Sequence, residues 1–323
     1  MSRDVAMENR RSVDAMHTPR GFDGVDRQDP TLAAEPEIGI ARPVETLAFT
    51  PRKESWVASS AGWFYKIFRR SDDPARDWLD PACIEKARRE YADMRLLRRL
   101  SDRVCCPARL DHACVVYPHL SGPDMRAMLR QRGVASQQRV AALRDAVTLL
   151  AQLHAETGNA VDYPAKDYLR KSYLAPGAEV LARIAVHERT LFIGGFEVRN
   201  FRFDRRHGAW FFFDPQHVFL GMPEDDLARF VISLLMANWG KGGSLRIWRG
   251  FDVGDLLATY EHASARTLDR LLLNHFLRET IAMRRHFAEK ALRGMRGAGR
   301  LIGRPYLSAY FLQLEKWVAK HEF

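Results

Sequence analysis

The stretches IGGFEVRNFRFD, residues 193–204, and FFFDPQHVFLGMPEDDLAR, residues 211–229, carry the strongest fold signal in this chain. Short apolar runs alternate in them with polar residues, and the pair His207-Gly208 lies between NFRFD and WFFFDP. Apolar runs bounded by turn-forming residues are typical of short strands. We therefore expect a small hairpin here, in a region that is otherwise mostly helical.

Two charged residues stand out upstream of these stretches. Lys66 lies in the apolar run GWFYKIF, residues 62–68, which predicts a strand, and Glu90 follows 24 residues later in PACIEKARREYADMRLLRRL, residues 81–100. Apolar residues recur in the second segment at steps of three and four, at Ile84, Ala87, Tyr91, Met94 and Leu97. This period predicts an amphipathic helix over residues 81–100.

The composition divides the chain into three parts. Residues 1–42 mix Arg, Asp, Pro and Gly with little apolar periodicity, so we expect a disordered leader. Residues 43–120 contain the expected strands and helix and predict a small β-rich lobe. Residues 121–323 predict a larger helical lobe, with helices notably at 138–157 and 263–293. The expected class is α+β, with two lobes.

Bulk composition narrows the class of protein only partly. The formal charge of +10 favours polyanionic partners such as nucleotides, nucleic acid or acidic lipid. The four cysteines show neither metal-ligand spacing nor disulfide density, and no run is apolar and long enough for a membrane-spanning helix. We expect a cytoplasmic protein, with peripheral contact with the inner membrane as an open alternative.

The order of elements resembles the two-lobed protein-kinase-like fold, and the residues resemble aminoglycoside phosphotransferases and lipopolysaccharide kinases. Such proteins carry a loop of the form H-G-D-x-H-x-x-N, a hydrophobic strand and then a metal-binding aspartate. Asn200 falls on the asparagine of the loop, and Asp214 falls on the aspartate. The pattern G-x-P-x-x-D-L-A follows at Gly221, Pro223, Asp226, Leu227 and Ala228. The resemblance covers roughly residues 45–262.

This resemblance implies a site for ATP and Mg²⁺. Lys66 would bind the α- and β-phosphates, and Glu90 would hold Lys66 by an ion pair. The strand VVYPHLSG, residues 115–122, with Tyr117 would form the hinge whose backbone binds adenine. Asn200 and Asp214 would hold the metal, so we expect their side chains to converge between the lobes.

Three features depart from the family pattern. Gly195 stands where the catalytic aspartate is expected, five residues before Asn200, and Ile193 stands where the histidine is expected. Glycine cannot accept a proton or orient a hydroxyl group, and losing a positioned base costs roughly 10²–10⁴ in rate. Glu197 is a weak substitute, and an aspartate introduced at position 195 is expected to raise or create phosphotransfer. The segment TPRKESWVASSAG, residues 50–62, offers only Gly62 for a loop over the phosphates.

Three function classes follow from these features. The first is a pseudokinase-like module that binds nucleotide with impaired or lost phosphotransfer. The second is an active phosphotransferase on a sugar or a lipopolysaccharide-type acceptor, or one that transfers the adenylyl group instead. The third is a charge-driven nucleic-acid binder, which we do not expect because no recognised module is present.

Some notable residues have a simpler structural interpretation. His154 ends an apolar helix and is expected to be a packed residue, and Asp226 is expected to cap a helix or support the catalytic loop. The segment 284–304 is basic, either as a solvated helical face or as a surface that adsorbs to anionic lipid. Its cations are Arg284, Arg285, Lys290, Arg293, Arg296, Arg300 and Arg304.

Overall fold

The computed structural model describes residues 43–156, 163–169, 172–216, 218–239, 246–294, 298–321 and 323, with side chains of the last helix described from residue 303. Residues 1–42, where we expected a leader, lie outside this part of the chain. The described residues belong to one compact unit, Ile40–Phe323. In them, no helix has both the length and the apolar character needed to cross a membrane.

The first lobe is built on an antiparallel sheet of five strands in the order β1-β2-β3-β5-β4. The strands are β1 Thr50–Pro51, β2 Ser55–Ser60, β3 Trp63–Phe68, β4 Arg109–Asp111 and β5 Cys114–Pro118. On β3, Tyr65 and Ile67 are buried, and Lys66 lies between them on the opposite face of the sheet. Lys66 is opposite Val57 of β2 and Val115 of β5 in the register. The sheet therefore fixes the position of Lys66 from both sides.

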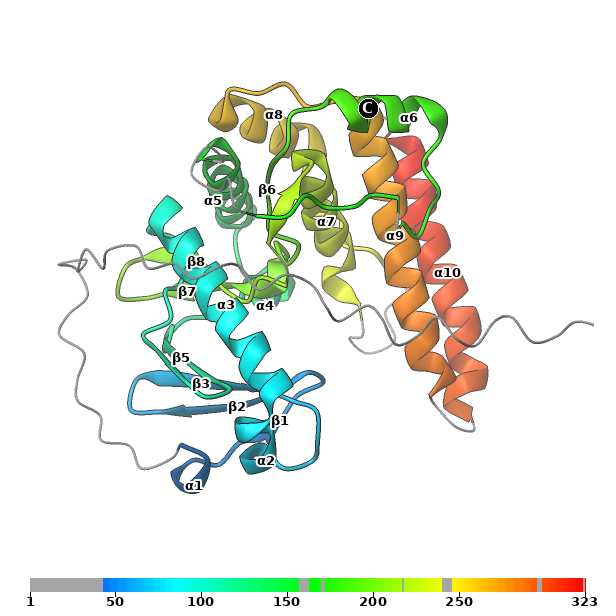
Figure 1. Ribbon diagram of the computed structural model, residues 1–323. Helices are drawn as coiled ribbons and strands as arrows, with labels where there is room; N and C mark the ends of the chain where they lie inside the picture. Colours follow the sequence, from blue (N-terminus) through cyan, green and yellow to red (C-terminus); the bar gives the residue numbers. More distant parts are fainter. Residues whose placement is uncertain are drawn as a thin grey trace, which may run out of the picture. The chain divides into compact units, whose positions relative to one another are not determined.

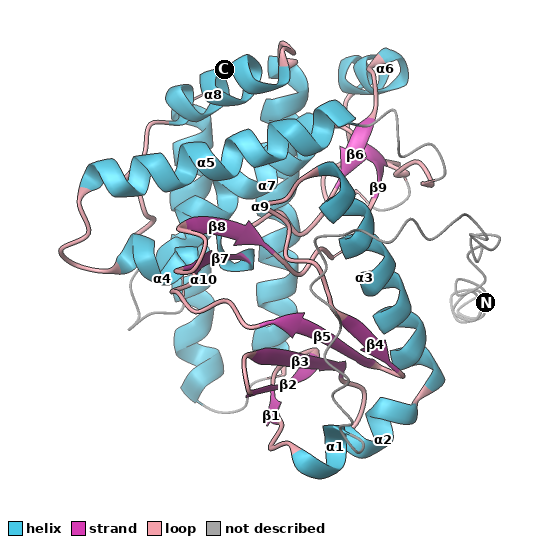
Figure 2. Cartoon of the chain, turned by 90° about the vertical axis from the view of Figure 1, so that its left-hand side faces the viewer, coloured by secondary structure: helices cyan, strands magenta, loops and turns pink. Residues whose placement is uncertain are grey.

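Helix α3, Pro81–Leu100, has the bounds expected from the sequence and lies beside this sheet (Figure 2). It begins at Asp80, whose side chain accepts hydrogen bonds from the backbone N–H groups of Ala82 and Cys83, with Pro81 in the first turn. Its buried face includes Ala87, Glu90, Met94 and Leu97. Two short helices, α1 Pro43–Thr46 and α2 Pro74–Leu79, complete the lobe.

The second lobe is helical, as the composition predicted. Its helices are α4 Met125–Arg130, α5 Ser136–Ala155, α6 Ala178–Val186, α7 Pro223–Leu235, α8 Val253–Ser264, α9 Arg270–Arg293 and α10 Ala298–Lys320. Helix α7 packs on α9, and α5 packs on α8. The long helices α9 and α10 run side by side (Figure 1).

The helix expected over residues 263–293 ends at Arg293 as predicted, but its predicted start is wrong. Helix α8 ends at Ser264, Ala265 adopts a left-handed conformation with φ of 52°, and α9 begins only at Arg270. Asp269 accepts a hydrogen bond from the backbone N–H of Leu272 and so starts the new helix. A left-handed residue cannot continue a right-handed helix, so the chain turns between the two segments.

In the described part of this lobe, two small pairs of antiparallel strands are present. Strands β7 Phe201–Asp204 and β8 Ala209–Phe212 form the hairpin predicted around His207-Gly208, and Gly208 has a positive φ of 62°. Strands β6 Thr190–Phe192 and β9 Phe219–Gly221 form the second pair. The β7–β8 hairpin rests on a buried cluster of aromatic rings, Phe196, Phe201, Phe212 and Phe230. Because Phe196 lies in the loop 193–200 and Phe201 follows it directly, this cluster holds the loop against the core.

Some cations of the basic segment 284–304 pair with carboxylates, and others are exposed. Arg284 pairs with Glu197, and Arg285 pairs with Glu315 at 2.6 Å. Lys290, Arg293 and Arg304 are exposed. Arg296 and the side chain of Arg300 lie outside the described residues.

Candidate active site

Lys66 is the centre of a buried ionic network. Its Nζ lies 2.6 Å from Glu90 Oε2 and 2.5 Å from Asp214 Oδ1, so the strand lysine contacts both the helix glutamate and the distant aspartate. Burial alone would lower the pKa of Lys66, but the carboxylates of Asp214 and Glu90 outweigh it and raise the pKa. The lysine is therefore a permanent cation held between two acidic groups.

Tyr117 contributes to the same network from the end of β5. Its hydroxyl donates a hydrogen bond of 2.6 Å to Glu90 Oε1. Burial and the neighbouring Glu90 carboxylate raise the pKa of Tyr117 well above its ordinary value, so the hydroxyl remains a donor. Burial also raises the pKa of Glu90, against the opposing effect of Lys66. The side chain of Tyr117 thus orients Glu90. Two residues further on, in the segment expected to form the hinge, the His119 N–H donates a hydrogen bond of 2.8 Å to the Gly62 carbonyl.

Asp226 of α7 holds the start of the loop that follows β6. Its carboxylate accepts hydrogen bonds from the backbone N–H of Ile193 at 2.6 Å and of Gly194 at 2.9 Å. His154 is fully buried and its ring lies between the Asp226 carboxylate, at 3.3 Å, and the Tyr260 hydroxyl, at 2.7 Å. The expectations that His154 is a packed residue and that Asp226 supports the loop are both confirmed. The interpretation of Asp226 as a capping residue is not needed.

Asn200 ties the end of the loop to Asp214. Its side-chain Nδ2 donates to the carbonyl oxygens of Gly195, at 2.8 Å, and Asp214, at 3.0 Å. Because both partners are acceptors, the amide nitrogen must occupy that side, and the amide oxygen is the atom left to bind other groups. Asp214 has a positive φ of 62°, and its side chain is 41% exposed. The structure therefore joins the Asn200 side chain to the backbone of Asp214, and the convergence of their side-chain oxygen atoms on a metal ion stays a prediction.

These two residues match the donors that Mg²⁺ accepts beside a nucleotide. Mg²⁺ takes oxygen ligands, commonly one or two from the protein together with water and phosphate oxygens. The carboxylate of Asp214 and the amide oxygen of Asn200 are such donors. Among the described side chains no group of three or more His, Cys, Asp and Glu is suited to a metal ion.

Gly195 is packed more tightly than the sequence indicates. An ideal Cβ at this position would lie 2.7 Å from the backbone nitrogen of Gln216 and 2.8 Å from the carbonyl oxygen of Asp214. Carbon atoms do not approach fixed backbone atoms this closely, so any side chain at 195 requires the chain to move. The expectation that Gly195→Asp raises or creates phosphotransfer stays a prediction, and the structure adds that the backbone of residues 214–216 must shift to accommodate the new side chain.

Glu197, the weak catalytic candidate, is engaged elsewhere. It is 3% exposed, and its carboxylate contacts Arg284 and, at 3.0 Å, the Nε atom of Arg199. Acting as a base would require it to leave these ion pairs. Sequence reasoning missed the arginines around it, since Arg126 and Arg284 lie far from Arg199 in the chain and belong to different helices.

Comparison with known proteins identifies the fold. No protein-family model and no curated protein sequence matches the chain. A candidate aminoglycoside phosphotransferase from Ralstonia eutropha is 16% identical with a TM-score of 0.56, covering 86% of this chain and 94% of its own. The Plasmodium vivax ethanolamine kinase is 9% identical with a TM-score of 0.53, covering 86% of each chain. A choline/ethanolamine kinase family protein from Mesorhizobium loti is 11% identical with a TM-score of 0.50, covering 84% of this chain and 87% of its own. The chain has a protein-kinase-like fold.

Proposed function

We propose that this chain is a kinase-fold protein that binds ATP with Mg²⁺ and has impaired or lost phosphotransfer. One arrangement carries the proposal. Lys66 is held between Glu90 and Asp214, while the position expected to bear the catalytic carboxylate is Gly195, packed against the backbone of residues 214–216. Groups suited to phosphate and metal are present, and the carboxylate expected for proton transfer is absent from position 195.

The charges in the site suggest that nucleotide and metal bind together. Lys66 contributes one positive charge, and Glu90 and Asp214 contribute two negative charges, so this group has a formal charge of −1. A triphosphate alone would be repelled by that excess. Mg²⁺ held by Asp214 and Asn200 would reverse its sign, since a metal ion neutralises charge on phosphate oxygens. Lys66, Glu90 and Tyr117 would then position the phosphates without taking part in proton transfer.

The rate expected for such a site is low. Kinases typically turn over at about 1–100 per second, and loss of a positioned base costs roughly 10²–10⁴, so we expect about 10⁻⁴ to 1 per second. Glu197 is the remaining candidate for a base, at the cost of breaking its contacts with Arg199 and Arg284.

The alternative is an active ATP-dependent phosphotransferase on a sugar or lipopolysaccharide-type acceptor. It is favoured by the likeness to structures named as small-molecule kinases and phosphotransferases. Exposed cations of the basic segment, Lys290 and Arg293, would then be suited to an anionic membrane surface carrying the acceptor. Transfer of the adenylyl group in place of phosphate belongs to the same alternative.

A thermal-shift experiment tests the proposal. At 100 times its dissociation constant, ATP with Mg²⁺ should stabilise the protein by roughly 2.7 kcal/mol, which is a rise of several degrees in Tm. Lys66→Met should abolish the rise, and the matched control Lys86→Met, on the exposed side of α3, should retain it. No rise in the wild-type protein would refute nucleotide binding. Incubation with labelled ATP then separates the alternatives, because turnover at an ordinary kinase rate would refute the impairment.

A further inference from the structure

A second cavity shares the catalytic loop with the candidate active site. We call it the arginine pocket, and its volume is about 250 Å³. Its wall comes from the loop, from α4, from the end of α7 and from α9. The lining residues are Arg126, Glu197, Val198, Arg199, Ser233, Met236, Trp239, Arg284, Phe287 and Ala288. Glu197, Val198 and Arg199 stand between Gly195 and Asn200 in the chain, so the same loop contributes to this pocket and to the candidate active site.

The arginine pocket has an excess of positive charge. It is lined by three arginines, Arg126, Arg199 and Arg284, and by one carboxylate, that of Glu197, an excess of 3 − 1 = 2 charges. Glu197 is shared between Arg199 and Arg284. Arg126 donates instead to the backbone carbonyls of Ala237, at 3.0 Å, and Trp239. One carboxylate therefore serves two of the three guanidinium groups, and the partners of the third are neutral backbone carbonyls.

Two further observations indicate that these cations lack counter-charge. The Nε atom of Arg284 is buried and has no hydrogen-bond partner among the described residues. Burial, together with the cations Arg130 and Arg199, lowers the pKa of Arg126. Buried guanidinium groups are normally fully hydrogen-bonded, and an unpaired one is costly. An anion in the arginine pocket would add the counter-charge that this cluster lacks.

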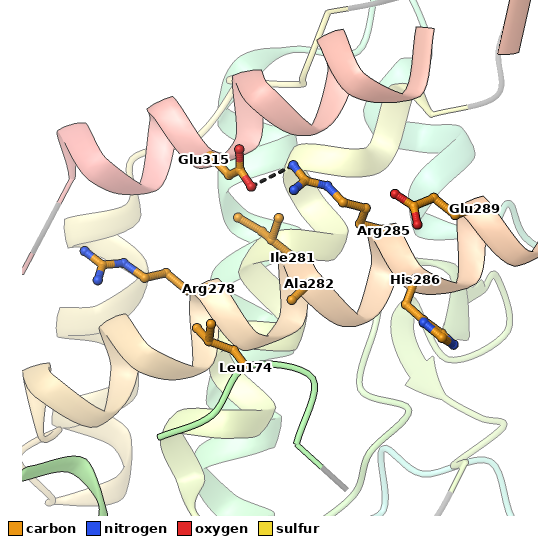
Figure 3. A pocket seen from close by; sticks show the side chains of 8 residues that line it. All are labelled: Leu174, Arg278, Ile281, Ala282, Arg285, His286, Glu289 and Glu315. Carbon is orange, nitrogen blue, oxygen red and sulfur yellow. Dashed lines mark hydrogen bonds and ion pairs between the residues drawn. The ribbon is translucent and has the colours of Figure 1, made fainter. Parts of the chain in front are cut away.

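Another cavity beside α9 does not share the excess of positive charge. Figure 3 shows that cavity, which has a volume of about 430 Å³ and is lined on its charged side by Arg278, Arg285, Glu289 and Glu315. Its two arginines are balanced by two glutamates, and Arg285 pairs with Glu315. The larger cavity therefore has no charge preference, whereas the smaller one does.

Apart from Ser233, the rest of the lining of the arginine pocket is apolar. Trp239 packs against Tyr306 and Tyr310 and so presents a fixed ring, and Phe287 is 46% exposed. Flat apolar surfaces beside a cluster of guanidinium groups suit a ligand with an anionic end and an apolar face. The volume of about 250 Å³ limits the enclosed part to roughly the size of one sugar ring with its charged group.

We propose that the arginine pocket binds the phosphate or carboxylate group of a small, sugar-sized molecule. Guanidinium groups recognise such groups by paired, charge-assisted hydrogen bonds. The site goes beyond the nucleotide site, because none of its lining residues contacts Lys66, Glu90 or Asp214 in the network described above. Its ligand would lie against the loop that carries Gly195 and Asn200, where an acceptor or an effector could act on that loop.

Calorimetric titration at constant ionic strength tests this site. The probes are glucose 6-phosphate and glucuronate, with glucose as the uncharged control. The wild-type protein should bind both anions and not glucose. Arg284→Gln and Arg199→Gln should each weaken binding at least tenfold, and Arg285→Gln, the next residue of α9 with its side chain in the other cavity, should leave it unchanged. Arg199 is 48% exposed, so its variant tests the site even if Arg284→Gln fails to fold.

Several results would overturn the proposal. They are no binding of either anion, equal binding in Arg199→Gln and wild type, or binding of glucose as tight as that of glucose 6-phosphate. Loss of anion binding in Lys66→Met would move the ligand to the nucleotide site. If the anions bind but ATP with Mg²⁺ does not raise the Tm, the proposal for the arginine pocket stands and only the nucleotide proposal is refuted. Co-sedimentation with phosphatidylglycerol vesicles that depends on Arg199, without binding of the soluble anions, would assign the pocket to a lipid headgroup instead.

Discussion

Gly195 is closely packed in the candidate site, and an added methyl group there should disturb the site measurably. In Gly195→Ala the new Cβ would lie 2.7 Å from the Gln216 nitrogen and 2.8 Å from the Asp214 carbonyl oxygen. Both contacts are with backbone atoms, which cannot rotate away as a side chain can. Either the loop at 195 or the segment 214–216 must move, and Asp214 carries one of the two carboxylates that contact Lys66.

The magnitude follows from two opposing effects. Overpacking of a tight site costs typically about 1–3 kcal/mol. Replacing glycine by alanine also restricts the unfolded chain and returns about 0.4–1 kcal/mol. Because both close contacts are with backbone atoms, the upper end of the overpacking cost applies, about 3 kcal/mol, and we expect Gly195→Ala to lower the free energy of unfolding by about 2–2.6 kcal/mol. Gly195→Asp should cost more, because it adds a carboxylate to the same filled space.

Urea unfolding of the purified variants measures this cost. Gly177→Ala is the matched control, since a Cβ there meets no atom within 4 Å and its φ is −69°. It should change the free energy of unfolding by less than about 1 kcal/mol, the scale of a helix-cap substitution. Gly195→Ala should also reduce the rise in Tm caused by ATP with Mg²⁺. The reasoning is refuted if Gly195→Ala or Gly195→Asp is as stable as wild type.

Three further predictions concern the buried acidic groups. Burial raises the pKa of Asp93 from 3.8 to about 6, so between these pH values the folded protein binds a proton that the unfolded chain does not. The free energy of unfolding should therefore fall by up to about 3 kcal/mol as the pH rises from about 4 to 6. Asp93→Asn, which keeps the contact with Tyr163, should lack this loss in urea unfolding at pH 4 and 7, and equal pH profiles for the two proteins would contradict it. Tyr117→Phe removes the donor to Glu90 and should cost about 1–3 kcal/mol of unfolding free energy; an unchanged value would mean that water replaces the hydroxyl. ATP without Mg²⁺ should raise the Tm far less than ATP with Mg²⁺, because the network around Lys66 has a formal charge of −1; an equal rise would show that the metal is not needed.

The sequence alone determined the architecture because its signals are local. The three- and four-residue period between Pro81 and Leu100, with Asp80 and Pro81 at its start, specifies an amphipathic helix without reference to the rest of the chain. The alternation in GWFYKIF places Lys66 on the face opposite Tyr65 and Ile67 in the same way. Where the local signal was weak, as at Ala265, the helix boundary was missed, since nothing in the residue itself marks a left-handed conformation.

The properties of the site depended on contacts between distant segments. The sequence places Lys66 and Glu90 at a suitable spacing, but only the folded chain brings Asp214 onto the same ammonium group and the hydroxyl of Tyr117 onto Glu90. Only the folded chain shows that Gly195 is packed against residues 214–216, so that backbone atoms occupy the space where a side chain at position 195 would lie. The arginine pocket arises likewise, from Arg126, Arg199 and Arg284 on separate elements. Periodicity and propensity act over a few residues, whereas the charge and free space of a site are set by whichever segments the tertiary fold brings together.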